Sequence, residues 1–155
     1  MAERHVRLVY GGGRIGLMGV MADAVLDAHG DVTGVIPDFL ASREIAHAGL
    51  TELLVVETMH ARKALMAARS DAFIAIPGGL GTLDELFEML TWSQLGLHDK
   101  PCGLLNVTGY FDDVVRFLDR AVADGFVKAR DRARIFVDTD AARLLERCQS
   151  GRISP

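Results

Sequence analysis

Short apolar runs alternate along the chain with longer segments whose apolar residues recur every three or four positions. A short run of this kind predicts a β-strand, and the longer spacing is typical of an amphipathic helix. The predicted strands cover residues 5–10, 32–36, 53–56, 72–76, 102–107 and 134–137. The predicted helices cover residues 17–29, 59–69, 82–95, 111–124 and 141–148.

Residues at the ends of these segments agree with the pattern. Thr58 is of the type that caps a helix N-terminus, and Gly30 is a candidate for the left-handed residue that ends the first helix. Pro37 ends the second strand. The run 72–76 is apolar throughout, which predicts a strand that is buried on both faces.

The alternation predicts an α/β fold with a doubly wound parallel sheet, whose crossover helices cover both faces in a three-layer αβα arrangement. We expect residues 1–155 to form a single domain, because no linker or repeat interrupts the pattern. Ligands of such sheets bind beyond the carboxyl ends of the strands. Function should therefore be sought in the loops after Tyr10, Ile36, Val56 and Ile76.

Composition narrows the choice of ligand. The chain has 17 basic and 21 acidic side chains and a net charge of −4, which argues against a nucleic-acid partner or a membrane surface. Cys102 and Cys148 stand alone, without the spacing of a metal site, so we expect reduced thiols and no metal. No signal-peptide pattern and no apolar run long enough to cross a bilayer is present, which indicates a cytoplasmic protein.

The first glycine-rich loop, Gly11–Gly16, fits the GxGxxG pattern between a strand and a helix. A dinucleotide site also needs an acid at the tip of the second strand, but Asp38 follows Pro37 instead. That arrangement argues against NAD or NADP. Two interpretations stay open: a turn that lets strand and helix pack closely, or part of a mononucleotide site shared with the second glycine loop.

The second glycine-rich loop, Pro77–Thr82, reads PGGLGT and precedes the long helix. Glycines let a ligand approach backbone N–H groups, and the positive end of a helix that begins near Thr82 points at the same place. We therefore expect an anion site. The Lys-Ser/Thr pair of a Walker loop is missing, which argues against hydrolysis of a nucleoside triphosphate.

Charged residues accompany this loop on two predicted helices. Asp84, Glu85 and Glu88 follow the glycines, where acids compensate a helix dipole but also repel a bound anion. Compensation of the helix dipole is a sufficient explanation for Asp84 taken by itself. Three acids beside an anion site instead favour a carboxylate that contacts another part of the ligand. Arg62 and Lys63 lie near the N-terminus of the preceding helix, where a bound anion would offset their unfavourable position. An ordinary exposed pair is the alternative.

Six segments of the sequence carry a resemblance to a known family. They are YGGGRIGLMG at 10–19, GVIP at 34–37, MHARK at 59–63, SDAFI at 70–74, PGGLGTLDE at 77–85 and TWSQLG at 91–96. Together they closely resemble the LONELY GUY family of cytokinin-activating phosphoribohydrolases, from about Val6 to Val137. The Arg-Lys pair and the PGGxGTxxE motif are the most specific of these segments. Family members are often labelled lysine decarboxylases, but no segment here resembles a pyridoxal phosphate site.

The resemblance implies a Rossmann-like homodimer. Its activity would be hydrolysis of the N-glycosidic bond of an adenosine 5′-monophosphate, typically N6-prenylated, to free base and ribose 5-phosphate, with no cofactor. The family's functional arginine and glutamate match Arg62 and Glu85, the expected catalytic residues. The expected substrate-binding residues are Glu44, Arg62, Lys63, Gly78, Gly79, Leu80, Gly81, Thr82, Leu83, Asp84 and Thr91. The glycines expected to line the phosphate pocket are Gly11, Gly12 and Gly13.

Each expected role has a chemical reason. Cleavage builds positive charge on the ribose ring, so a carboxylate such as Glu85 beside C1′ lowers the barrier and activates water. The phosphate would lie on the N–H groups from Gly78 to Thr82. Asp84 stands where family members commonly have Glu, which shortens one carboxylate.

Two further expectations concern the extent of the chain and its activity. Family members usually have one more βα unit before the Tyr-Gly-Gly-Gly segment, and without it we expect unpaired backbone groups on two neighbouring strands. The alternatives to the hydrolase are a nucleotide-binding or carrier module with weak or no hydrolysis, and a general purine nucleotide nucleosidase.

Overall fold

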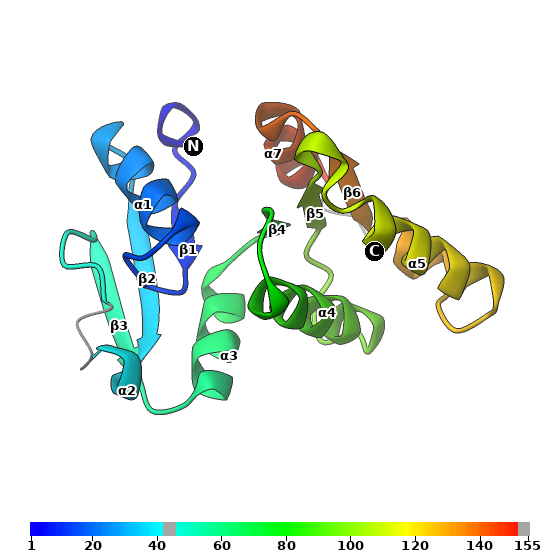
Figure 1. Ribbon diagram of the computed structural model, residues 1–155, viewed down its shortest axis with the longest axis horizontal. Helices are drawn as coiled ribbons and strands as arrows, with labels where there is room; N and C mark the ends of the chain where they lie inside the picture. Colours follow the sequence, from blue (N-terminus) through cyan, green and yellow to red (C-terminus); the bar gives the residue numbers. More distant parts are fainter. Residues whose placement is uncertain (42–45, 152–155) are drawn as a thin grey trace. The chain divides into compact units, whose positions relative to one another are not determined.

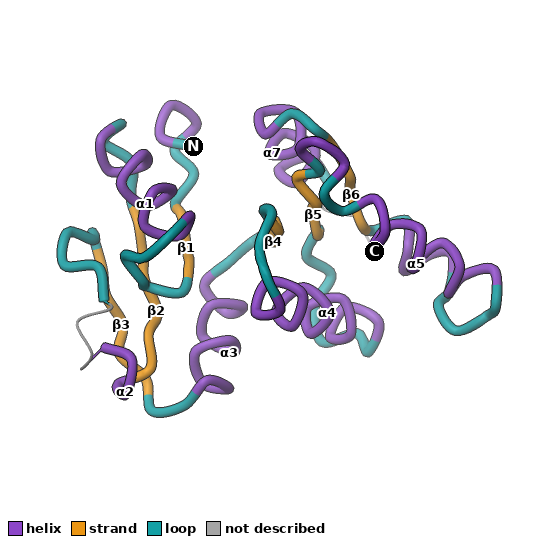
Figure 2. Tube along the Cα trace, in the orientation of Figure 1, coloured by secondary structure: helices purple, strands orange, loops and turns teal. Residues whose placement is uncertain are grey.

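The computed structural model describes residues 1–41 and 46–151 and divides into two compact units, Met1–Ser70 and Asp71–Pro155. Helices and strands alternate within each unit (Figures 1 and 2). In the described residues each unit holds a three-stranded parallel sheet, ordered β1-β2-β3 in the first and β4-β5-β6 in the second. The predicted α/β fold of parallel sheets flanked by helices is confirmed. The single domain and the further βα unit stay predictions.

The first unit is built around β2, which is buried along its whole length. A strand of this kind needs cover on both faces, and both long helices of the unit pack on it. α1 contributes Ala22 and Val25 to a core shared with Leu8, Tyr10 and Val32. The elements are β1 (Leu8–Tyr10), α1 (Leu17–Asp27), β2 (Val32–Pro37), α2 (Asp38–Leu40), β3 (Glu52–Val56) and α3 (Met59–Arg69).

The end of α1 corrects one prediction. His29, not Gly30, is the left-handed residue, with φ of 58°. The N–H of His29 donates to the Leu26 carbonyl and that of Gly30 to the Val25 carbonyl, both at 2.8 Å, which is the Schellman pattern. Gly30 is needed for space instead, because a β-carbon there would lie 2.7 Å from a methyl group of Val25.

The start of α3 confirms another prediction. The hydroxyl of Thr58 accepts a hydrogen bond from the N–H of Ala61 at 3.1 Å, and the helix begins at Met59. This cap satisfies one of the backbone donors that a helix N-terminus leaves unpaired. The first turn of α3 contains no acidic residue to complement the dipole.

The second unit is covered on both faces of β5. Leu104 packs in a core with Leu86, Phe111 and Ile135, whereas a β-carbon on Gly103 would meet Leu144 and Cys148 of α7. Successive strand residues point to opposite faces, so α4 and α5 cover one side and α7 the other. The elements are β4 (Phe73–Ala75), α4 (Leu80–Gln94), β5 (Cys102–Leu105), a 3₁₀ turn (Val107–Gly109), α5 (Asp112–Ala123), α6 (Ala129–Arg132), β6 (Ile135–Asp138) and α7 (Ala141–Ser150).

β4 differs from its prediction. Ile74, at its centre, is 37% exposed, so the expected burial on both faces is wrong. The sheet order explains the difference, because β4 lies at an edge of its sheet and pairs with β5 alone among the described strands. An apolar run does not distinguish a central strand from an edge strand.

Cys102 and Cys148 are both free and buried, as expected of reduced thiols. Burial raises the pKa of the Cys102 thiol to about 12, and it also raises that of Cys148. Both thiols are therefore protonated and unreactive at neutral pH.

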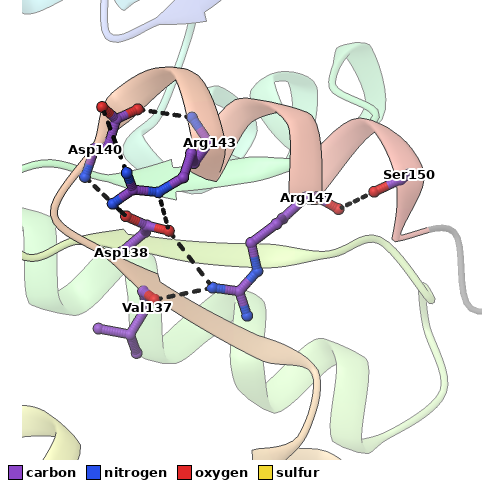
Figure 3. A network of polar contacts seen from close by, with 6 residues as sticks. All are labelled: Val137, Asp138, Asp140, Arg143, Arg147 and Ser150. Carbon is purple, nitrogen blue, oxygen red and sulfur yellow. Dashed lines mark hydrogen bonds and ion pairs between the residues drawn. The ribbon is translucent and has the colours of Figure 1, made fainter.

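A network of charges fixes α7 to the end of β6 (Figure 3). The carboxylate of Asp138 accepts from the guanidinium of Arg143 at 2.8 Å and from the N–H of Asp140 at 2.9 Å. Arg147 donates to the Val137 carbonyl at 3.0 Å. The hydrogen bond from Arg143 is the main reason why the pKa of Asp138 lies below its ordinary value. Within residues 1–41 and 46–151, no helix has the length and apolar character needed to span a membrane.

Candidate active site

The predicted site residues fall into two groups, one in each compact unit. The first unit holds Gly11, Gly12, Gly13, Arg62 and Lys63, and the second holds Gly78, Gly79, Leu80, Gly81, Thr82, Leu83, Asp84, Glu85 and Thr91. Glu44 lies outside the described residues.

In the first unit the structure brings Arg62 and Gly11 together. Arg62 is buried, with 9% of its surface exposed. Its guanidinium lies against Gly11: a β-carbon there would be 2.8 Å from Cζ of Arg62, and closer still to Nη2. Nη1 lies 3.8 Å from the sulfur of Met59, one turn earlier on α3. The end of β1 and the first turns of α3 thus place a buried cation at the glycine loop, with Lys63 half-buried beside it.

The other glycines of this loop also pack closely. Gly12 has φ of 73°, and a β-carbon on Gly34 of β2 would lie 2.8 Å from the Gly12 Cα. The Gly12 carbonyl accepts from the N–H of His47 at 2.9 Å, and Gly13 forms an isolated bridge with Ala46. These contacts favour the interpretation of the loop as a turn for close packing. Its role in a phosphate pocket stays a prediction.

In the second unit α4 begins earlier than predicted. Gly79 caps the helix and Leu80 is its first residue, so the predicted start near Thr82 is wrong. The N–H groups of Thr82 and Leu83 both donate to the Gly79 carbonyl, at 3.1 and 3.3 Å. The Thr82 amide is thus used by the helix. The N–H groups of Leu80 and Gly81 precede the first helical hydrogen bonds and point outward from the N-terminus, as an anion site requires.

Two side chains hold the loop before this helix. Thr82 folds back onto Gly78, where a β-carbon would lie 3.1 Å from the Thr82 Cβ and closer still to its hydroxyl. The hydroxyl of Tyr110 donates to the Gly78 carbonyl at 2.6 Å. Asn106 supports Tyr110, because its side-chain oxygen accepts from the N–H of Phe111 at 2.7 Å.

Sequence reasoning missed Tyr110. It lies in the loop after β5, at the carboxyl end of a parallel strand, and that position is the only sequence signal that could have drawn attention to it.

The acids of α4 lie beyond its first turn. Because the helix starts at Leu80, Asp84 is in the second turn, where interaction with the helix dipole has largely faded. Dipole compensation therefore explains Asp84 less well than the sequence suggested. Glu85 is half-buried beside it, and Glu88 follows one turn later.

A hollow of about 440 Å³ lies along one face of α4. Three of the predicted site residues and their neighbours form its lining: Leu83, Asp84, Phe87, Glu88, Thr91 and Trp92. The hydroxyl of Thr91 donates to the Phe87 carbonyl at 2.7 Å. The structure thus gathers Leu83, Asp84 and Thr91 in one place, with Glu85 next to them along the helix.

Parallel sheets flanked by helices, with glycine-rich loops after β1 and β4, define a Rossmann-like α/β protein. A profile of a protein family described as possible lysine decarboxylase matches residues 18–148. The chain is 55% identical over 141 residues to the cytokinin riboside 5′-monophosphate phosphoribohydrolase of Rhodococcoides fascians, which covers 90% of this chain and 71% of the relative.

Two plant proteins give a similar result. Identity is 52% over 149 residues to the probable cytokinin riboside 5′-monophosphate phosphoribohydrolase LOGL1 of Oryza sativa subsp. japonica, covering 96% of this chain and 67% of that protein. Identity is 51% over 146 residues to LOG2 of Arabidopsis thaliana, which has the same enzyme name, covering 94% of this chain and 68% of that protein. The chain belongs to the family of cytokinin riboside 5′-monophosphate phosphoribohydrolases, which confirms the resemblance seen in its motifs.

Proposed function

We propose that this protein is a cytokinin riboside 5′-monophosphate phosphoribohydrolase. It hydrolyses the bond between the base and C1′ of an adenosine 5′-monophosphate, typically N6-prenylated: water adds a hydroxyl to C1′, and the free base leaves with a proton. The observation that carries the proposal is the identity of 55%, 52% and 51% to relatives named for this activity, over 90% or more of this chain.

Glu85 is the proposed catalytic carboxylate. Breaking the glycosidic bond builds positive charge on the ribose ring, which a fixed carboxylate stabilises, and the same group can take a proton from the attacking water. Its half-buried place on a regular helix supports this role, because a rigid element holds the carboxylate in one orientation.

The 5′-phosphate of the substrate binds at the N-terminus of α4. The exposed residues Gly79, Leu80 and Gly81 present N–H groups there, and the helix dipole favours an anion. Tyr110 holds the preceding loop in place through the Gly78 carbonyl.

Arg62 is the second proposed catalytic residue. A buried guanidinium is always charged and keeps a fixed direction, so it can act on the phosphate or on the departing base. Kinetics separate the two roles. Loss of a phosphate contact in Arg62→Ala raises KM with little change in kcat, whereas loss of a contact to the departing base lowers kcat. We further propose a cytoplasmic homodimer.

The direct test is to incubate the protein with adenosine 5′-monophosphate and with isopentenyladenosine 5′-monophosphate and to follow free base and ribose 5-phosphate by chromatography. We expect equal amounts of both products, with faster release from the prenylated substrate. Nucleotide binding without release from either substrate, by folded protein, would contradict the proposal and favour a carrier module.

The role of Glu85 has its own test. Glu85→Gln keeps the shape of the side chain but removes the charge, so turnover should fall by about a hundredfold or more while nucleotide binding is kept. Glu146→Gln on α7 makes the same chemical change away from the proposed site and should leave turnover unchanged. Turnover by Glu85→Gln equal to that of the wild type would exclude Glu85 as the catalytic carboxylate.

A further inference from the structure

We propose that Gly11 and Met59 position the guanidinium of Arg62 by contacting its two terminal nitrogens, a role that rests on the function of Arg62 proposed above. Gly11 leaves the space in which Nη2 lies, and Met59 places its sulfur against Nη1. Both are positioning residues for the reaction, because they act on the nucleotide through Arg62.

Space is the reason for a glycine at position 11. Its backbone is not among those with positive φ, so its conformation does not require glycine. A β-carbon would instead lie 2.8 Å from Cζ of Arg62, a distance that real β-carbons do not show, and 3.3 Å from Nε. The guanidinium occupies the volume that any side chain at this position would take. Alanine would therefore force the guanidinium to move.

Met59 contacts the other terminal nitrogen. Residues three apart on a helix share a face, and Nη1 of Arg62 lies 3.8 Å from the Met59 sulfur. A thioether accepts hydrogen bonds weakly, and its polarisable sulfur adapts to the surface of the guanidinium. The two contacts therefore constrain the guanidinium at both of its terminal nitrogens.

The orientation of the guanidinium matters because of the geometry of arginine. The N–H donors of a guanidinium form a rigid fork, so its orientation decides which donors meet an anion or a leaving group. Lysine carries a compact charge on a flexible stem and is much less sensitive to such support. A displacement of about 1 Å in a catalytic group can cost about a hundredfold in rate.

Stability measurements test the Gly11 contact without any activity assay. Gly11→Ala should lower the urea midpoint of the wild type, because the displaced guanidinium is buried. In an Arg62→Ala background the added methyl group has room, and the decrease should be at most half as large. Gly49→Ala is the matched control in the same unit, because its β-carbon meets only the His47 ring, at 3.3 Å or more, and should change the midpoint little.

Each outcome of these urea measurements either supports or contradicts the Gly11 contact. Equal decreases in the two backgrounds would overturn it. If Gly11→Ala alone does not fold, a folded Gly11→Ala/Arg62→Ala protein supports the contact, and an unfolded double variant contradicts it.

Kinetics test Met59. Met59→Leu keeps the volume but removes the sulfur acceptor, so kcat/KM should fall by about threefold to tenfold. Met59→Gln offers an amide oxygen on a chain of similar length and should recover most of that loss, which a purely structural role would not produce. Met66→Leu, the same change elsewhere on α3, should have no effect. A Met59→Leu protein with unchanged kcat/KM would overturn the role of Met59.

The stability cycle and the activity assay together also separate this inference from the proposed function. If the wild type releases no base, the proposed function fails while the stability cycle still decides whether Gly11 makes room for Arg62. If the wild type is active and the cycle shows no coupling, the function stands and the positioning role fails.

Discussion

Removal of the Tyr110 hydroxyl tests the support of the glycine loop before α4. This hydroxyl donates to the Gly78 carbonyl at 2.6 Å, and Tyr110→Phe removes the bond without changing the ring. A neutral hydrogen bond contributes about 0.5–1.5 kcal/mol to stability, and the half-exposed position of Tyr110 points to the lower part of that range. If the same energy is lost from phosphate binding, KM should rise by about threefold to fivefold, with kcat nearly unchanged.

The other tyrosine of the chain is the matched control. The hydroxyl of Tyr10 is buried and has no hydrogen-bond partner within residues 1–41 and 46–151. Burial raises its pKa to about 12, with Asp23 adding to the effect, so the group is neutral at every pH of the assay. Tyr10→Phe therefore removes a buried hydroxyl that makes no hydrogen bond among the described residues. Its effect on the unfolding free energy should be neutral or stabilising by about 1 kcal/mol.

Urea unfolding and steady-state kinetics measure both variants under the same conditions. We expect a lower stability in Tyr110→Phe, an unchanged or higher stability in Tyr10→Phe, and an increase of KM in Tyr110→Phe alone. The reasoning fails if Tyr110→Phe leaves KM unchanged, or if it lowers kcat without affecting KM. A destabilised Tyr10→Phe would show that the buried hydroxyl has a partner and would remove the control.

Three further predictions concern stability. Thr58→Ala should lower the unfolding free energy by about 1 kcal/mol, whereas Thr58→Ser should keep it, and equal urea midpoints for the two variants would contradict the cap. The Nδ1 of His98 accepts from the N–H of Lys100 at 3.2 Å, and burial holds the pKa of His98 below 6.5, its ordinary value. As the pH falls, the unfolded chain therefore takes up the His98 proton before the folded chain does. This stabilisation is complete above pH 6.5 and is lost as the pH falls through the lower folded pKa. His98→Gln should flatten that part of the urea-midpoint profile, and an unchanged slope would exclude His98 as its source. The pKa of Asp138 is lowered mainly by Arg143, so its stabilisation is present above the ordinary carboxyl pKa and lost in acid. Asp138→Asn should lower the urea midpoint at pH 7 and reduce its fall below pH 4, and a midpoint equal to that of the wild type at pH 7 would refute the role of the network.

Periodicity predicted most of the fold correctly because it reports burial. The helix 59–69 and its Thr58 cap agree with the structure, since the cap and the apolar spacing point to the same boundary. The short helices α2 and α6 were not predicted, because three or four residues are too few to show a period. The exposure of Ile74 could not be predicted either, since the order of strands in a sheet depends on contacts between distant segments.

Glycine illustrates what the sequence shows and what it hides. The pattern marks Gly11, Gly12 and Gly30 as one type of residue, but the structure gives each a different reason. Gly12 has a positive φ, Gly30 leaves space for Val25, and Gly11 leaves space for a guanidinium from another element. The last reason depends on a residue far along the chain, which no local motif can reveal.

The same distinction holds for the candidate site as a whole. The residues proposed to carry the chemistry, Arg62 and Glu85, are visible in the sequence because a reaction limits the type and spacing of such residues. Residues that support the site act through a single atom: Met59 places its sulfur beside Arg62, and the hydroxyl of Tyr110 binds the Gly78 carbonyl. Neither role could be read from the sequence, although Met59 lies within one of the family segments. A supporting contact is worth only about 1 kcal/mol, yet it sets the orientation of a group whose displacement costs far more in rate. Met59→Leu should therefore change the kinetics more than it changes stability, and that ratio separates a positioning residue from an ordinary packing residue.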